Sequence, residues 1–552
     1  MPARDARASR ASIIGLTVIL GLAAIYLLHA GRGTSPFFDE WDWITRRRGV
    51  SAETLLGPHN GHLSLVPVVM YKVLLQTAGI DHYWVFRTVL VVLHLGCAIV
   101  VFRLARARVG DVGAMFAAGF VAVLGAAGDD LLWAFQIGFV VAVLLGLGAL
   151  LALDRDTRRG DIAAAVLLAS SLASASVGAA FAVAVLVEIV LHPRRRERWW
   201  VIVAPLVLYA LWYLGYGESE VRRENLGVAP VYAAESGSAA AGGVLGLTLA
   251  YGRILLVGLA AATGLRVWRA DRLGPRLVAL ALAPLALWVL TALTRAQYHE
   301  PAAPRYIYTG AILLVLLTCE LLEGQVVPPR IQAVTLLGIL LAFAAVSNAH
   351  IIDTTSGGLR QQAADVRARL GALDLVSADV DPGLQFSPQN APQLVAGLAL
   401  SAERAFGHIG LSAAALAHVP QAQGQAADDV LRAAGALRVA PGAPPTVAAP
   451  PPAAMITGGR LRRSGGCVLS RATSSDARVD VIVPDGEAVV VSTTEAAGVL
   501  ARRFAATFTT QPVAQTAPGG ALRVETRADA SPVPWHVVVA SAGNVKVCRA
   551  GA

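Results

Sequence analysis

Eleven apolar runs, most of them long enough to cross a bilayer as a helix, dominate the first 347 residues of this chain. Only 15% of the 552 residues are charged, against about 25% in soluble globular proteins, and the mean hydropathy is +0.59. These features exclude a large soluble enzyme and predict an α-helical polytopic membrane protein. The expected spans are residues 12–30, 84–102, 113–128, 134–153, 162–174, 177–191, 199–216, 249–265, 277–294, 306–322 and 331–347.

Arginine-rich loops set the predicted orientation. Arg4, Arg7 and Arg10 precede the first run, which places the N-terminus in the cytoplasm. A cleaved signal peptide is the alternative, but the run is longer than a usual signal core and lacks a convincing cleavage site. The net charge of +9 is therefore an orientation signal, and nothing indicates nucleic-acid binding. One run, Arg46-Arg-Arg48, falls in the first outer loop, against the pattern.

The stretch 162–192 tests this topology. As a single helix it would move the basic segment 192–198 to the outside, against the positive-inside rule. Two short helices that turn near 174–178 keep both flanks in the cytoplasm. We therefore predict a hairpin, eleven spans, and a C-terminus on the outer face of the plasma membrane.

Hydropathy falls after residue 347, the predicted end of the transmembrane domain. Residues 348–440 have helical periodicity, and 441–453 form a proline-rich linker. Residues 454–552 contain short alternating runs that predict a small extracytoplasmic β-sandwich. Cys467 and Cys548 lie near its two ends, and an exported domain would join them in a disulfide. In the chain-entropy model that bond contributes about 4–5 kcal/mol.

Two polar segments follow the first span. Phe37-Phe-Asp-Glu-Trp-Asp-Trp43 contains Asp39, Glu40 and Asp42 beside aromatic residues. Such carboxylates suit general-base chemistry or a divalent cation such as Mg²⁺ or Mn²⁺, and a solvated loop with interfacial tryptophans is the alternative. Farther on, His59 and His62 have no third ligand nearby in sequence, so we expect them to line a pocket rather than bind zinc.

Two further features fall on the predicted outer side. Gly128–Gly138 contains Asp129, Asp130, Trp133 and Gln136, and the glutamine either pairs with a neighbouring helix or lines a cavity. Arginines also lie at outer helix ends, where an unpaired charge is costly. Their planar guanidinium groups suit a lipid phosphate, with snorkelling or an ion pair to Glu300 as the alternative. These arginines are Arg87, Arg253 and Arg305.

Together, these segments resemble the GT-C superfamily of membrane glycosyltransferases, which use polyprenyl-phosphate sugars on the outer face. The resemblance covers the layout of about residues 10–347. It rests on Asp39-Glu40, on Trp133-Ala-Phe-Gln136 and on Pro304-Arg-Tyr-Ile-Tyr308. The arginine-rich composition and the C-terminal module are similar to actinobacterial arabinofuranosyl- and mannosyltransferases. The chain has fewer spans than the oligosaccharyl- and aminoarabinose-transferase branches.

The resemblance implies an inverting transfer from a polyprenyl-phosphate sugar to a cell-envelope glycan or lipid. It implies Asp39 as general base, Glu40 as its neighbour or a metal ligand, and Arg305 on the donor phosphate, helped by Arg87 or Arg253. Tyr306 would line the pocket. The alternatives are a lipid-linked-sugar transporter, an assembly scaffold, and an acyltransferase using the two histidines; no convincing internal repeat supports a transporter.

Overall fold

The computed structural model describes residues 9–270, 274–323, 331–443, 450–509 and 511–550. Its contacts divide the chain into two compact units. Unit 1 comprises Met1–Pro36 and Arg46–Arg360, and unit 2 comprises Phe37–Thr45 and Gln361–Ala552. The four segments expected from sequence, with boundaries at 347, 440 and 453, stay a prediction.

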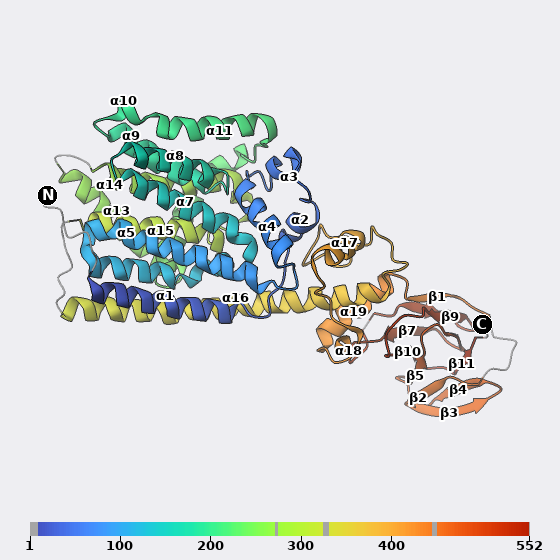
Figure 1. Ribbon diagram of the computed structural model, residues 1–552. Helices are drawn as coiled ribbons and strands as arrows, with labels where there is room; N and C mark the ends of the chain where they lie inside the picture. Colours follow the sequence, from blue (N-terminus) through green and yellow to red (C-terminus); the bar gives the residue numbers. More distant parts are fainter. Residues whose placement is uncertain (1–8, 271–273, 324–330, 444–449, 510, 551–552) are drawn as a thin grey trace. The chain divides into compact units, whose positions relative to one another are not determined.

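Unit 1 is a bundle of helices (Figure 1). The shorter helices are α3 (Ala52–Leu56), α4 (Leu65–Thr77), α6 (Gly128–Leu132), α8 (Arg158–Leu172), α9 (Gly178–Leu191), α10 (Arg195–Arg198) and α12 (Ala229–Gly243). The longer ones are α1 (Arg10–Ala30), α5 (Trp84–Ala122), α7 (Ile137–Leu153), α11 (Trp200–Tyr216), α13 (Leu249–Trp268), α14 (Pro275–Arg295), α15 (Pro304–Leu321) and α16 (Ile331–Leu375). The boundary between the units falls within α16.

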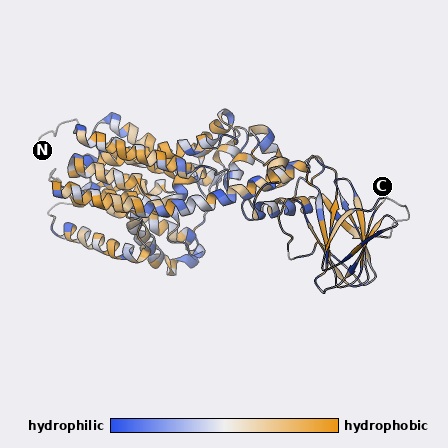
Figure 2. Ribbon diagram, turned by 90° about the horizontal axis from the view of Figure 1, so that it is seen from below, coloured by the Kyte–Doolittle hydropathy of each residue, from blue (hydrophilic) through white to orange (hydrophobic). Residues whose placement is uncertain are grey.

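Many apolar side chains of unit 1 are exposed, as contact with lipid requires. On α1, Ile14, Val18, Leu22 and Ile25 form one stripe along the helix and are 53–69% exposed. Eight helices in the described part of the chain are long and apolar enough to cross a membrane. Figure 2 shows hydrophobic residues along the bundle helices. This is a multi-pass membrane protein, and its orientation stays a prediction.

The helices agree with the expected hairpin and differ from the expected spans in two respects. Residues 162–191 form two helices, α8 and α9, of 15 and 14 residues, as the hairpin prediction requires. The runs 84–102 and 113–128 have no loop between them, because α5 breaks only at Gly110, with φ 75° and ψ −178°. Two helices, α4 and α12, were not expected from sequence.

Unit 2 contains α2 (Glu40–Thr45), α17 (Ala396–Phe406), α18 (Ala413–Leu416) and α19 (Gln421–Ala433), followed by two antiparallel sheets. The first sheet has the order β1-β9-β6-β11-β4-β3, and the second β2-β5-β10-β7-β8. The strands are β1 (Leu437–Pro441), β2 (Ala453–Thr457), β3 (Gly459–Ser464), β4 (Cys467–Ala472), β5 (Arg478–Val483), β6 (Ala488–Thr493), β7 (Ala497–Arg502), β8 (Ala514–Thr516), β9 (Ala521–Thr526), β10 (Trp535–Ala540) and β11 (Val545–Arg549).

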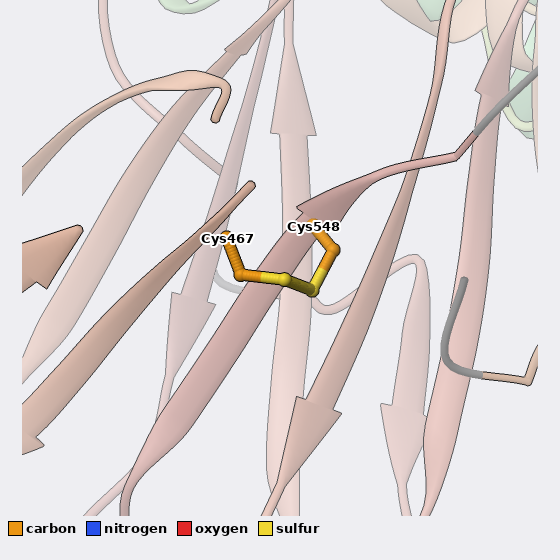
Figure 3. Close-up of a disulfide and its surroundings, with 2 residues drawn as sticks. All are labelled: Cys467 and Cys548. Carbon is orange, nitrogen blue, oxygen red and sulfur yellow. A yellow bond between two sulfur atoms is a disulfide. The ribbon is translucent and has the colours of Figure 1, made fainter. Parts of the chain in front are cut away.

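The predicted disulfide is confirmed. Cys467 and Cys548 are opposite one another on the paired strands β4 and β11, and their sulfur atoms are bonded (Figure 3). The alternating runs expected from sequence, 478–484, 488–492, 522–526, 535–540 and 545–548, fall on β5, β6, β9, β10 and β11, because valine-rich segments favour a pleated sheet. Residues 444–449 of the expected proline-rich linker lie outside the described residues.

Candidate functional site

A short irregular segment of unit 1 carries four of the predicted site residues. It consists of α6, Trp133 in an extended conformation, and the single turn η2 (Ala134–Gln136) that leads into α7. Gly128 opens α6 against Thr355 of α16, where a Cβ atom would lie 2.7 Å from the threonine Oγ1. The absence of a side chain at Gly128 therefore allows α6 to approach α16 closely, and this contact fixes the position of the adjacent Asp129 and Asp130.

Asp130 is buried without a partner. Its side chain is 0% exposed, and among the described residues neither carboxylate oxygen has a hydrogen-bond partner. The charge of the adjacent Asp129 acts on Asp130, and the charge of Arg305 acts on both. A buried carboxylate is costly unless it is protonated or bound to something. This arrangement indicates a position where a polar ligand binds. Gln136 is also buried, and its Oε1 has no hydrogen-bond partner among the described residues.

Arg305 lies in the first turn of α15 and connects this segment to the predicted phosphate site. Its guanidinium donates to Glu300 at 3.3 Å and lies over the Tyr306 ring, 4.9 Å from the centroid. The ion pair with Glu300 is thus present, as one of the two sequence interpretations expected. The side chains of Arg305 and Glu300 are 33% and 59% exposed, and such exposed ion pairs contribute only about 0–1 kcal/mol to stability. A phosphate anion can therefore compete with Glu300.

Arg87, in the first turn of α5, has unsatisfied donors. It is 9% exposed, and its Nε and Nη1 have no hydrogen-bond partner among the described residues. It packs against Gly31 at the end of α1, and the charge of Arg32 acts on it. Two cations close together, one of them buried with free N–H groups, favour an anion between them.

Tyr83 links Arg87 to the irregular segment, and sequence reasoning did not single it out. It interacts electrostatically with Arg87, and its hydroxyl accepts the backbone N–H of Ala134 at 3.3 Å. A tyrosine before an apolar run carries no signal of such a contact, because the contact joins residues 51 positions apart in the chain.

Arg253 does not share these contacts. It extends from α13 and donates to Glu235 of α12 at 3.0 Å. The structure therefore gives it an ion-pair partner in a helix that was not expected from sequence. Its predicted role in phosphate binding stays untested.

The two histidines belong to one tight turn. Their backbones exchange N–H···O bonds of 3.0 and 2.9 Å, and Asn60 and Gly61 between them both have positive φ. Asn-Gly is the typical sequence for such a turn, so the spacing of His59 and His62 is explained by backbone geometry.

The side chains of this turn reach the irregular segment. The His59 ring lies edge-on to Phe135 with centroids 5.4 Å apart, and Phe135 stacks on Trp133 at 5.0 Å. Burial first, and then the charges of Arg295 and His59, lower the pKa of His62 to about 3. His62 is therefore neutral at physiological pH.

The acidic segment with Asp39 belongs to unit 2. Glu40 is fully buried and accepts the N–H of Phe37 at 3.2 Å, while Asp39 and Asp42 are half-buried. Two hydrogen bonds fix the segment to the loop before α17: the backbone carbonyl of Asn390 accepts the N–H of Phe38, and the side-chain amide of Gln393 donates to the carbonyl of Phe38. Among the described residues, no cluster of three histidine, cysteine, aspartate or glutamate ligands includes this segment.

Comparison with known proteins gives a distant structural likeness. Neither a family model nor a curated protein matches this chain. A single-particle cryo-EM structure of a mutant of the arabinofuranosyltransferase AftD from Mycobacteria is similar, with 14% identity and a TM-score of 0.36. The likeness covers 96% of this chain but spans only 60% of that neighbour. It is too distant to support an argument, so function rests on the residues described above.

Proposed function

We propose that this protein is a membrane glycosyltransferase that moves a sugar from a polyprenyl-phosphate donor to a cell-envelope glycan or lipid. The observation that carries the proposal is the pair of buried, unsatisfied charges in unit 1. Arg87 needs an anion and Asp130 needs a hydrogen-bond donor. A sugar phosphate supplies the anion, and the hydroxyl group of an acceptor supplies the donor.

Binding would begin at the cationic groups. The Nε and Nη1 of Arg87 would donate to phosphate oxygens, with Arg32 adding positive charge, and Arg305 would exchange Glu300 for the phosphate or its sugar. Trp133, which is half-buried and stacks on the buried Phe135, would offer its ring to the apolar face of a sugar. Arabinofuranose and mannose are the sugars that the family resemblance favours.

The chemical step is a single displacement. The acceptor oxygen forms a bond to the anomeric carbon, and the bond from that carbon to the phosphate oxygen breaks with its electron pair. The acceptor proton passes to a carboxylate, and polyprenyl phosphate leaves with inversion at the anomeric carbon. Positive charge at the phosphate stabilises the leaving group. No step requires a metal ion, although a divalent cation is a cofactor that the acidic groups could use.

Two carboxylates are candidates for the base. Asp39 is the one implied by the family resemblance, and it lies in unit 2. Asp130 is the one whose surroundings favour the role, because it is buried and has no hydrogen-bond partner among the described residues. An experiment distinguishes the two residues, because the rate of sugar transfer should fall by about 10²–10⁴-fold in the variant that lacks the base.

The test is sugar transfer in liposomes. Purified protein receives labelled polyprenyl-phosphate arabinose or mannose and a cell-wall glycan acceptor, beside Asp39→Asn and Asp130→Asn. Asp81→Asn, which changes an exposed acid on the loop before α5, is the matched control. We expect transfer by the wild type and the control, and loss in one Asn variant.

Two results would overturn parts of the proposal. Full activity in both Asn variants would remove both residues from the base role. Donor that crosses the bilayer without any transfer would move the protein to the transporter class.

A further inference from the structure

Unit 2 brings together three side chains that play no part in the proposed reaction. Asp374 lies near the end of α16, Glu403 lies on α17, and His408 lies in the loop that follows α17. One potential ligand atom from each lies within 4.8 Å of the others. The His408 Nε2 is 3.2 Å from Asp374 Oδ2, and its Nδ1 is 3.5 Å from Glu403 Oε1.

Each carboxylate has a buried oxygen without a hydrogen-bond partner among the described residues, although the imidazole of His408 lies 3.2 Å from the oxygen of Asp374. The Glu403 side chain is only 4% exposed, and among the described residues its Oε2 has no hydrogen-bond partner. Asp374 Oδ2 is likewise buried without a hydrogen-bond partner. Ligand atoms of the two carboxylates lie within 4.8 Å of each other, so their negative charges repel and the geometry favours a positive charge bound beside them.

The backbone holds the cluster in place. The Oε1 of Glu403 accepts the N–H groups of Ile409 and Gly410, each at 3.0 Å, which orients the carboxylate. Arg367 of α16 donates to the Ile409 carbonyl at 3.1 Å, and its own carbonyl accepts the N–H of Leu411 at 3.0 Å. The loop is therefore attached to α16 on both sides of Gly410.

Gly410 itself leaves room for the cluster. A Cβ atom at this position would lie 2.8 Å from Asp374 Oδ2 and would crowd the carboxylate. Carboxylates that bind metals are usually oriented by hydrogen bonds of their own, as the carboxylate of Glu403 is here.

We propose that Asp374, Glu403 and His408 bind one Zn²⁺ ion. An imidazole with two carboxylates suits zinc, whereas Ca²⁺ and Mg²⁺ prefer oxygen ligands alone. Two ligands of a tetrahedral zinc are about 3.3 Å apart, close to the 3.2 Å between His408 Nε2 and Asp374 Oδ2. His408 is 54% exposed, so water completes the coordination. The ion would tie the end of α16 and α17 to loop 407–411.

The experiment measures zinc on the full-length protein in detergent. The protein is stripped with EDTA, dialysed against ZnCl₂, MnCl₂ or CaCl₂, and analysed for bound metal and for thermal unfolding. His408→Ala removes one ligand at a half-exposed position. His418→Ala changes an exposed histidine of the same unit and is the matched control. Glu403→Gln keeps the volume of the second ligand but removes its charge.

We expect one zinc per chain in the wild type and in His418→Ala. In both proteins zinc should raise the midpoint temperature of thermal unfolding by several degrees. Zinc affinity should fall at least tenfold in His408→Ala and in Glu403→Gln. Equal zinc content in the wild type and His408→Ala would overturn the site. Preferential uptake of Mn²⁺ or Ca²⁺ would overturn the choice of metal. Neither outcome bears on sugar transfer, which uses none of these residues.

Discussion

Unit 1 contains two groups of buried charges that differ in one respect. Arg276 on α14 pairs with Asp154 at 2.9 Å and with Glu188, and Arg198 pairs with Asp161. Arg87 and Asp130 are just as buried, but the atoms named above have no hydrogen-bond partner among the described residues. Burial alone therefore does not identify a functional charge. The paired charges hold helices together, while the unpaired ones indicate a place for a ligand.

Breaking the paired group should have the largest effect on stability. Arg276→Gln leaves Glu188 and Asp154 without their cation, and such a loss costs about 3–5 kcal/mol of unfolding free energy. Thermal or denaturant unfolding in detergent measures it. Replacing Arg276 and Glu188 together by leucine should recover most of the loss. If the double variant is as unstable as the single one, these residues do not act as a pair.

The unpaired group should show the opposite behaviour. Arg87→Gln removes a buried cation that lacks hydrogen-bond partners, so its unfolding free energy should not fall. Transfer from the lipid-phosphate donor should fall by about 10²–10³-fold, because a positive charge at the leaving phosphate is lost. The liposome assay checks this, with Arg223→Gln, an exposed arginine, as the control. An unstable but active Arg87→Gln protein would reverse the comparison.

His62 gives a smaller, pH-dependent effect. Its pKa is about 3 in the folded chain, below the ordinary 6.5, so only the unfolded chain takes up a proton as the pH falls below 6.5. The contribution of His62 to the free energy of unfolding is fully present above pH 6.5 and decreases as the pH drops toward 3. Between pH 7.5 and 5.5 it decreases by about 1 kcal/mol. Unfolding at the two pH values, compared with His62→Gln, measures this difference. A pH dependence that is unchanged in His62→Gln would assign it to other groups.

The exposed pair of Arg253 and Glu235 should show the smallest effect. Arg253 is 57% exposed, and exposed ion pairs contribute about 0–1 kcal/mol. Arg253→Gln should therefore shift the unfolding free energy by less than about 1 kcal/mol. A loss near that of Arg276→Gln would mean that Arg253 has a second role.

Much of the fold follows from sequence because apolar runs and arginine-rich loops are local signals. The turn between α8 and α9 was predicted from charge alone, since a single helix would have placed the segment 192–198 on the wrong side. Helices α4 and α12 were missed because 13 and 15 residues are too short to span, and α12 is rich in alanine and glycine.

The candidate site was only partly predictable. Residue types pointed to Asp130 and Arg87, but whether a charge has a partner depends on residues far away in the chain. Arg253 shows this, because its partner Glu235 lies in a helix that was missed. The spacing of the two histidines is set by the local Asn60-Gly61 turn, whereas the contact of His59 with Phe135 depends on residues far away in the chain.

The backbone conformation of Gly110 limits the substitutions and insertions that this protein tolerates. The chain reverses there in a single residue whose φ and ψ only glycine adopts readily, so any side chain would add strain of about 1–3 kcal/mol. Reporter tags and cysteine labels used to map topology are placed in surface loops, and the junction at Gly110 has no such loop. A scan of substitutions and insertions should find residue 110 intolerant to both, whereas the exposed Ala107, one turn earlier in α5, should accept most replacements.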